Sequence, residues 1–185
     1  KTVAPNAFKN YTLLKSVTLP SELSSIGTYA FYGCKNLESI NIPENVTSIS
    51  PYAFKDCASL KTINIPSSLT VINAFVFSGC RSLEFPTLPD SITKIDSSAF
   101  MGCTSFKEVV LPQNVKTLGA FAFSACSSVK SIKIPATLNE IGKNAFYECD
   151  ALTSVYYSGN EEEFKKIEID SGNEAFISAE VIYAH

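Results

Sequence analysis

Six cysteines are the residues best suited to chemistry, and they recur every 23 residues, at Cys34, Cys57, Cys80, Cys103, Cys126 and Cys149. A metal site needs ligands that converge on one point, whereas one cysteine per repeat spreads the ligands along a column. A catalytic thiol needs a basic partner, and the only histidine, His185, is the last residue. Parallel side chains on neighbouring strands are about 4.8 Å apart, slightly too far for a disulfide. The pattern predicts six buried, unbridged thiols that pack as small apolar residues.

Other chemical signatures are missing from the sequence. It contains no phosphate-binding loop, nucleophile elbow or metal-binding motif. Its Asp and Glu residues are scattered over positions expected to be exposed, without an evident acid–base pair. We therefore expect no catalytic residue, no cofactor and no metal, in a protein that is not an enzyme.

Charge and hydropathy argue against two classes of partner. The 185 residues include 18 acidic and 15 basic ones, for a net charge of -3. No basic excess is present to neutralise the phosphates of nucleic acid or of an anionic membrane surface. No apolar run approaches the roughly 20 residues that a membrane span needs, so we expect no membrane insertion.

Phenylalanine and proline follow the same 23-residue period as cysteine, from Phe8 to Phe146 and from Pro20 to Pro135. One unit, residues 37–59, reads L-E-S-I-N-I-P-E-N-V-T-S-I-S-P-Y-A-F-K-D-C-A-S. A unit this short cannot bury its own apolar side chains, and stacking on its neighbours solves that problem. The period therefore predicts a repeat solenoid with one continuous core.

Three segments follow each other within a unit. Alternating apolar residues before the proline predict a short half-buried strand, and a return segment follows. A column of residues favoured at helix N-caps then predicts one helical turn: Gly27, Ser50, Asn73, Asp96, Gly119 and Gly142. Parallel crossovers are right-handed. The expected fold is a right-handed β/α superhelix, with a parallel sheet on one face and short helical turns on the other.

The repeat resembles the BspA-type leucine-rich repeats of bacterial surface proteins. The resemblance rests on N-I-P-E-N-V-T-S-I-S-P-Y-A-F-K-D-C (residues 41–57) and its copies, and on a C-terminal stretch similar to the cap of such arrays. We expect residues 1–155 to form the leucine-rich repeat solenoid and residues 156–185 a cap continuous with it. Glu161–Glu163 followed by Lys165 and Lys166 predicts a short helix in this cap.

Outward-facing strand positions are the candidate binding surface. Most are Ser, Thr or Asn, and one column alternates Lys and Glu from Lys15 to Lys107, which favours lateral ion pairs. Exposed apolar residues among polar ones, with local positive charge, are typical of a protein-binding site. In the C-terminal half these are Phe85, Glu108, Val110, Lys130, Lys133 and Tyr156. Irregularity without function is the alternative, since Pro86 replaces a core residue and its distortion of the strand would hide the Phe85 ring.

Two further features leave alternatives open. The column Tyr29, Tyr52, Phe75 and Phe121 serves either packing between turns or a ligand track. The first strand, near residues 13–19, is expected to leave an open ladder edge. Missing upstream repeats or a partner chain would cover this edge, and self-association is one such arrangement. Because the sequence begins with Lys1 rather than Met, we expect a piece of a longer or processed chain.

The family resemblance implies a function. It implies an extracellular or cell-surface bacterial protein that takes part in adhesion, with a host or matrix protein or a glycan as partner. The alternative is a passive spacer that presents other domains. The resemblance brings no ligand-binding residues with it, so the candidate residues above rest on the sequence pattern alone.

Overall fold

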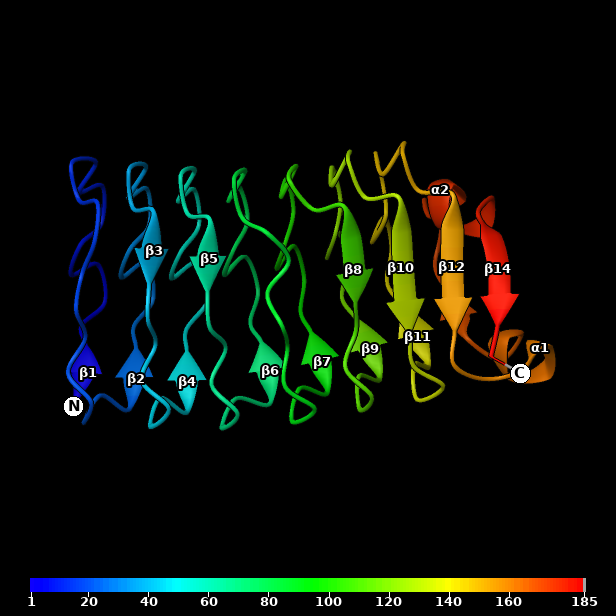
Figure 1. The fold of residues 1–185 in the computed structure, drawn as a ribbon, viewed down its shortest axis with the longest axis horizontal. Coiled ribbons are helices and arrows are strands. Elements are labelled where there is room, and N and C mark those ends of the chain that lie inside the picture. Colours follow the sequence, from blue (N-terminus) through cyan, green and yellow to red (C-terminus); the bar gives the residue numbers. More distant parts are fainter. Residues whose placement is uncertain (185) are drawn as a thin grey trace.

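The chain winds into a stack of similar coils along one axis (Figure 1). The computed structural model describes residues 1–184, so His185 lies outside the described residues. Successive coils pair in parallel with a shift of 23 residues, as in Ser25↔Ser48 and Ile132↔Val155. Each coil thus provides the ladder partner of the next. The predicted parallel solenoid with a 23-residue period is confirmed.

One face of the stack carries the predicted parallel sheet, here called the front sheet. It has a two-stranded part, β3 (Ser39–Ile40) and β5 (Thr62–Ile63). A four-stranded part follows, with β8 (Glu108–Val110), β10 (Ser131–Ile134), β12 (Ser154–Tyr157) and β14 (Glu180–Tyr183) in neighbouring order. The coil between the two parts, residues 84–88, forms no strand (Figure 1).

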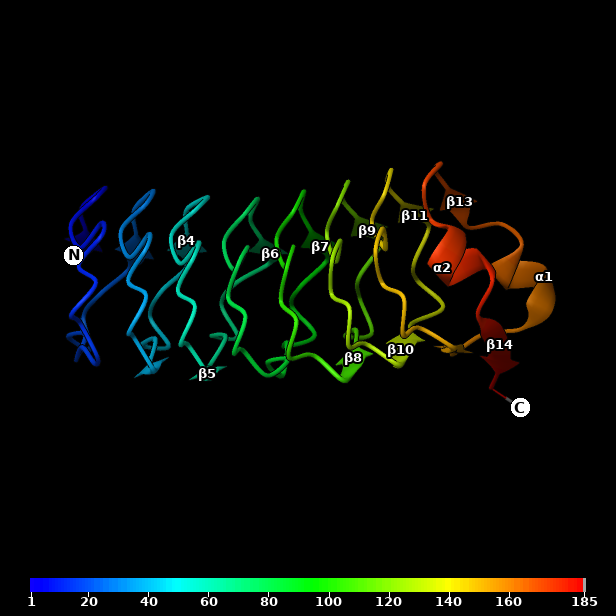
Figure 2. The same ribbon diagram turned by 90° about the horizontal axis from the view of Figure 1, so that it is seen from above.

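The return segment forms a second parallel ladder, which Figure 2 shows along the side of the stack away from the front sheet. Its first part holds β1 (Thr2–Val3), β2 (Ser25–Ile26) and β4 (Ser48–Ile49). Its second part holds β6 (Val71–Ile72), β7 (Lys94–Ile95), β9 (Thr117–Leu118), β11 (Glu140–Ile141) and β13 (Glu168–Ile169). Each strand is two residues long, too short to show an alternating pattern in the sequence.

The structure differs from the predicted helical turns on the far face. Between the ladders the chain forms consecutive hydrogen-bonded turns, because alternate amides bond to the next coil. Tyr52 N–H donates to the Ala74 carbonyl at 3.1 Å, and Phe54 N–H to the Val76 carbonyl at 3.0 Å. Tyr52 also has φ 63°, in the left-handed region. A right-handed helix would need both amides and that residue for itself.

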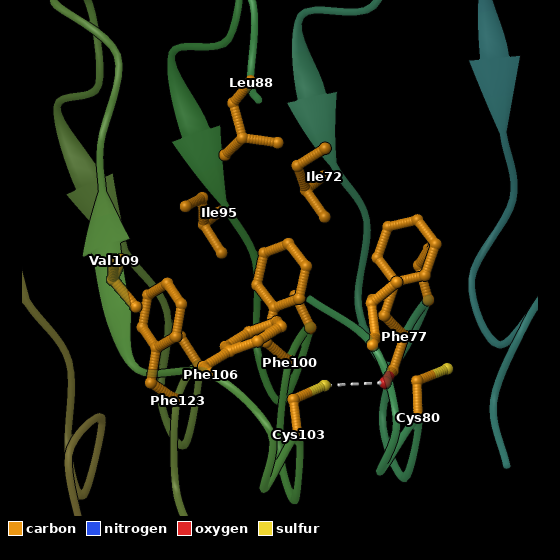
Figure 3. Packing of buried hydrophobic residues seen from close by; sticks show 14 of the residues in the cluster. Ile72, Phe77, Cys80, Leu88, Ile95, Phe100, Cys103, Phe106, Val109 and Phe123 are labelled. Atoms are coloured by element: carbon orange, nitrogen blue, oxygen red, sulfur yellow. Dashed lines mark hydrogen bonds between the residues drawn. The ribbon is translucent and has the colours of Figure 1, made fainter. Parts of the chain in front are cut away.

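A stack of phenylalanine rings runs through the core, one from each repeat. Neighbouring rings are nearly parallel, with centroids 5.2 Å apart for Phe31 and Phe54 and 5.7 Å for Phe123 and Phe146. The cysteine column lies beside this stack, and each thiol donates to the carbonyl of the phenylalanine 26 residues earlier. Figure 3 shows this bond for Cys103 and Phe77, where the distance is 3.2 Å. All six thiols are buried and free, as the sequence predicts.

Burial raises the pKa of every one of these thiols, because a thiolate would lose its hydration in the apolar core. The pKa of Cys149 rises to about 12. A thiol with a raised pKa is a poor nucleophile at neutral pH. The cysteines therefore pack the core and satisfy carbonyl groups, and they do not form a reactive row.

The C-terminal segment closes the stack with two short helices, α1 (Glu161–Phe164) and α2 (Glu174–Ile177). The acidic helix predicted from Glu161–Glu163 is confirmed, and Asn160 caps it. The α2 residue Phe176 adds the last ring to the stack, 4.9 Å from Phe146. The buried Asn173 accepts from Phe146 N–H at 3.0 Å and donates to the Gly142 carbonyl at 3.1 Å. This amide replaces the backbone partners of a further coil, while the boundary at residue 156 stays a prediction.

The N-terminal coil does not have the edge that the sequence suggests. Residues 13–19 form no strand, so the expected open edge of the front sheet near Leu13 is wrong. The outermost strand at this end is β1 of the second ladder, which pairs with β2. The reason is local: Leu14, Val17 and Leu19, which begin the buried columns of this face, are only partly buried in the first coil.

Candidate partner-binding face

Four outward side chains lie at one level across the four-stranded part of the front sheet. The strand register places Val110 beside Lys133, Lys133 beside Tyr156, and Tyr156 beside Ile182. Because side chains alternate between the two faces of a strand, their neighbours Val109, Ile132 and Val155 point into the core. Val110, Tyr156 and Ile182 are 47%, 39% and 36% exposed. We call Val110, Lys133, Tyr156 and Ile182 the outward row.

An ion pair fixes the charged member of the outward row. The Lys133 ammonium lies 2.9 Å from the Glu108 carboxylate, and both side chains remain about half exposed. Lys133 therefore has its charge held toward β8, and its aliphatic stem is free to cover apolar surface between its neighbours. Lys130 is exposed as predicted, but it forms no ion pair within residues 1–184 and lies just before β10, outside the outward row.

Phe85 is not an exposed anchor. Its ring is half-buried and packs on the core rings of Phe106 and Phe100, with centroids 5.1 and 5.6 Å apart. Pro86 occupies the position that Ile63 fills one repeat earlier, and it is buried. The smaller ring of Pro86 leaves core volume, which Phe85 fills by turning inward. The geometry therefore supports the expectation that a distortion at Pro86 hides the Phe85 ring.

Two surface hollows adjoin the outward row. The larger, of about 610 Å³, lies between the coil of residues 85–90 and that of residues 108–113, and it includes Phe85, Glu108 and Val110 in its lining. The smaller, of about 200 Å³, includes Lys133, Tyr156 and Ile182. Five of the six predicted residues thus line a hollow on one continuous face. Whether they bind a partner remains a prediction.

Ile182 belongs to the same surface, and sequence reasoning missed it. The residues of the outward row from Val110 to Tyr156 follow the 23-residue period, but Ile182 comes 26 residues after Tyr156. The cap helices change the spacing and take Ile182 out of the column. The alternation in Val181–Tyr183, which matches that in Val155–Tyr157, is the signal that would have found it.

Three of the four rings of the aromatic column on the far face pack on one another. Tyr29 and Tyr52 stack with ring centroids 4.8 Å apart, and Tyr52 and Phe75 follow at 4.7 Å. Lys9 covers Tyr29 at 5.0 Å from its centroid, and Lys55 lies near Phe75. Because Tyr29, Tyr52 and Phe75 cover each other's faces, packing between turns accounts for these three rings. Phe121 is 36% exposed and stacks on none of them, so the choice between packing and a ligand track stays open for this residue.

Two further observations concern the described residues. Within residues 1–184, no group of three or more His, Cys, Asp or Glu side chains is arranged to hold a metal ion. In the same part of the chain, no helix has the length and apolar character required to cross a bilayer.

Each repeat contributes one short strand to a parallel ladder and one buried apolar segment that ends at a proline. Repeats of this kind define a leucine-rich repeat solenoid, which is a protein-interaction type of module. The model of the BspA type leucine rich repeat region matches residues 1–103 and 75–176. The chain therefore belongs to the BspA-type leucine-rich repeat family. A comparison with curated protein sequences gives no match.

Solved structures of bacterial proteins are similar to this chain. The leucine-rich repeat protein TpLRR of T. pallidum is 36% identical over 82% of the chain and 71% of its own length, with a TM-score of 0.74. A leucine-rich repeat protein from Bacteroides ovatus is 26% identical, with a TM-score of 0.59, over 91% of this chain and 63% of its own. The pneumococcal vaccine antigen PcpA shares the fold at 21% identity and a TM-score of 0.65, over 93% and 56%. The chain thus spans less than two thirds of the latter two proteins.

Proposed function

We propose that this chain is a non-enzymatic recognition module of a secreted or cell-surface bacterial protein, which binds a partner protein through the C-terminal part of its front sheet. The observation that carries the proposal is the outward row, where Tyr156 and Ile182 lie side by side and Lys133 separates them from the third exposed apolar side chain, Val110. In the two-stranded part, by contrast, the outward residues are polar. An apolar patch on a rigid sheet, rimmed by polar residues, is what a protein-binding site requires.

Family membership supports the location and the adhesive role. The family resemblance associates such repeats with surface display, and one structural relative, from Faecalibacterium prausnitzii, is named as a leucine rich cell surface protein. The competing hypothesis is a passive spacer, which would use its coils only to hold other domains at a distance. A spacer has no reason to place apolar side chains on one stretch of an otherwise polar face.

The test begins with a partner isolated from extracellular matrix or host surface proteins on the immobilised chain. Tyr156→Ala and Ile182→Ala are each expected to weaken binding about tenfold, because truncation of a central apolar anchor costs more than about 1 kcal/mol. Asn41→Ala is the matched control, since Asn41 takes the same outward position in the two-stranded part. If all three variants bind the partner equally well, the outward row is not the binding surface.

A further inference from the structure

A polar hollow of about 460 Å³ lies on the edge of the stack where the turns lead into the front sheet, the upper edge in Figure 1. We call it the edge hollow. Its lining extends over the first four coils, and each coil contributes a polar or charged side chain: Asn10, Lys35, Asp56 and Arg81. The outward row lies in the C-terminal half of the chain, so the two surfaces share no residue.

Glycines alternate with polar residues along one column of the edge hollow, in the order Asn10, Gly33, Asp56 and Gly79. A Cβ added at Gly33 would collide with the side-chain oxygen of Asn10, and one at Gly79 would collide with the Asp56 carboxylate. Each of these oxygens therefore lies over the bare backbone of the next coil. A side chain at either glycine would displace the oxygen, so glycine preserves the polar lining of the hollow.

Two cations line the edge hollow at the same position of the repeat. Lys35 and Arg81 come from coils that are separated by one other coil, in which the small residue Ala58 takes this position. Adjacent strands of a ladder are about 4.8 Å apart, so the backbones of Lys35 and Arg81 are roughly 10 Å apart. Both side chains are exposed, and within residues 1–184 neither forms an ion pair. The hollow thus presents two separate positive charges to a ligand.

The Asp56 carboxylate belongs to the coil between these two cations. It is half-buried, and within residues 1–184 it forms no ion pair and no side-chain hydrogen bond. An ionised carboxylate can only accept hydrogen bonds. A ligand that fits the edge hollow therefore supplies a donor, such as a hydroxyl group, between two anionic groups.

The charge around the edge hollow is opposite in sign to that of the whole chain. The turn segments of the first four coils hold four basic residues and one acidic residue, for a net charge of +3, whereas the chain carries -3. These segments are residues 5–12, 28–35, 51–58 and 74–81. The matching segments of the next two coils, 97–104 and 120–127, hold no charged residue. A local excess of positive charge attracts an anionic ligand to the N-terminal half of this edge.

We propose that the edge hollow binds an acidic glycan. Carboxylate or sulfate groups on alternate sugars pair with Lys35 and Arg81, and a hydroxyl group of the sugar between them donates to Asp56. An acidic peptide suits the hollow less well, because its carboxylates would meet Asp56 and few of its side chains carry a hydroxyl donor. This inference does not depend on the proposed function, since it concerns a different ligand and different residues.

Two tetrasaccharides are the probes, and NMR titration of the chain measures their affinity. One alternates glucuronate with N-acetylglucosamine and carries two carboxylates, and the other is a chondroitin sulfate fragment that adds sulfate groups. The variant Lys35→Ala/Arg81→Ala is expected to weaken binding about tenfold, because both ion pairs are lost. Lys143→Ala is the matched control, since Lys143 is an exposed cation in the turn segment of another coil, and it should leave the affinity unchanged.

Asp56→Ala distinguishes a built site from simple attraction between charges. Alanine fits this column, because Ala125 takes the same position at φ 57°. Loss of the hydroxyl acceptor should weaken glycan binding about threefold, whereas charge attraction alone would make binding tighter once an acid is removed. The proposal is overturned if Asp56→Ala strengthens binding or leaves it unchanged, or if neither acidic tetrasaccharide binds. Equal binding of a neutral N-acetylglucosamine tetrasaccharide or of tetraglutamate would also overturn it, because the ligand would then not be an acidic glycan.

Discussion

The two parts of the front sheet share their buried residues and differ in their outward ones. Ile40 and Ile63 are buried in the two-stranded part, as Val109 and Ile132 are in the four-stranded part. At the outward positions, however, Asn64 uses its side-chain amide to bond both the N–H and the carbonyl of Ile42, each at 2.7 Å. In the four-stranded part, the same positions hold the residues of the outward row.

This difference explains why the strands differ in length. Where the Asn64 side chain takes the ladder bonds, the backbone cannot, and β5 ends after two residues. Where the outward residue is Lys133 or Tyr156, the backbone pairs with itself and the strand reaches four residues. The Asn64 side chain is thus used for bonds within the fold, while the apolar side chains of the outward row remain exposed. The core constrains both parts alike, so functional variation is confined to the outward positions.

The largest effect that we expect from the shared core is loss of stability in alkali. The unfolded thiols ionise near their ordinary pKa of about 8.5, while burial keeps the folded thiols protonated to higher pH. The unfolded chain therefore binds fewer protons above this pH, and the free energy of unfolding falls as pH rises, by up to about 1.4 kcal/mol per pH unit for each thiol. The stabilisation is complete below the unfolded pKa. Urea unfolding between pH 8 and 11, followed by circular dichroism, measures the slope.

The two parts of the molecule can be compared by means of one cysteine variant in each part. Cys57→Ala and Cys126→Ala should each flatten this slope by a similar amount, up to about 1.4 kcal/mol per pH unit, since both thiols are fully buried and donate to a carbonyl. A slope that neither variant changes would show that the thiol column is not the origin of alkaline sensitivity.

A smaller effect, but a more local one, is expected from the ring stack. Phe54→Ala and Phe123→Ala both empty a fully buried position between two stacked rings, and each should cost about 3–5 kcal/mol of unfolding free energy. Urea unfolding at pH 7 measures both. Costs that differ by more than about 2 kcal/mol would mean that the core is not equivalent in the two parts. Relief of the Phe123 cavity by the nearby Phe85 ring is the physical reason to examine in that case.

The sequence alone was enough to predict which residues form the core, but not the conformation of the backbone around the core. The columns of Phe31 and Cys34 follow from period alone, because a buried position in a stacked repeat tolerates one size of side chain. The segment around Tyr52 has apolar spacing that suits either a helical turn or consecutive turns bonded to the next coil. Only the backbone hydrogen bonds between neighbouring coils distinguish the two conformations. The residue types do not reveal these bonds.

The candidate site was predictable to the same extent. Val110, Lys133 and Tyr156 depart from the polar column within the period, so their outward placement could be read from the sequence. Phe85 takes an outward register position, but its ring fills the volume that Pro86 vacates, which requires knowledge of the neighbouring rings. Each error thus arises where two residues compete for one space or where the period changes.

The smallest expected effect concerns the two exposed ion pairs, one in each part of the front sheet. Lys61 and Glu38 are 3.3 Å apart, and Lys133 and Glu108 are 2.9 Å apart, with all four side chains about half exposed or more. Water and salt screen such charges, so double-mutant cycles with Lys→Met and Glu→Gln should give coupling energies of about 0–1 kcal/mol for each pair. Both should shrink in 0.5 M salt. Partner binding distinguishes the two parts: Lys133→Met should alter affinity for the partner, because Lys133 belongs to the outward row, while Lys61→Met should not. A coupling well above 1 kcal/mol for Lys133 and Glu108, with unchanged partner affinity, would instead make that pair a structural clamp and remove Lys133 from the binding face.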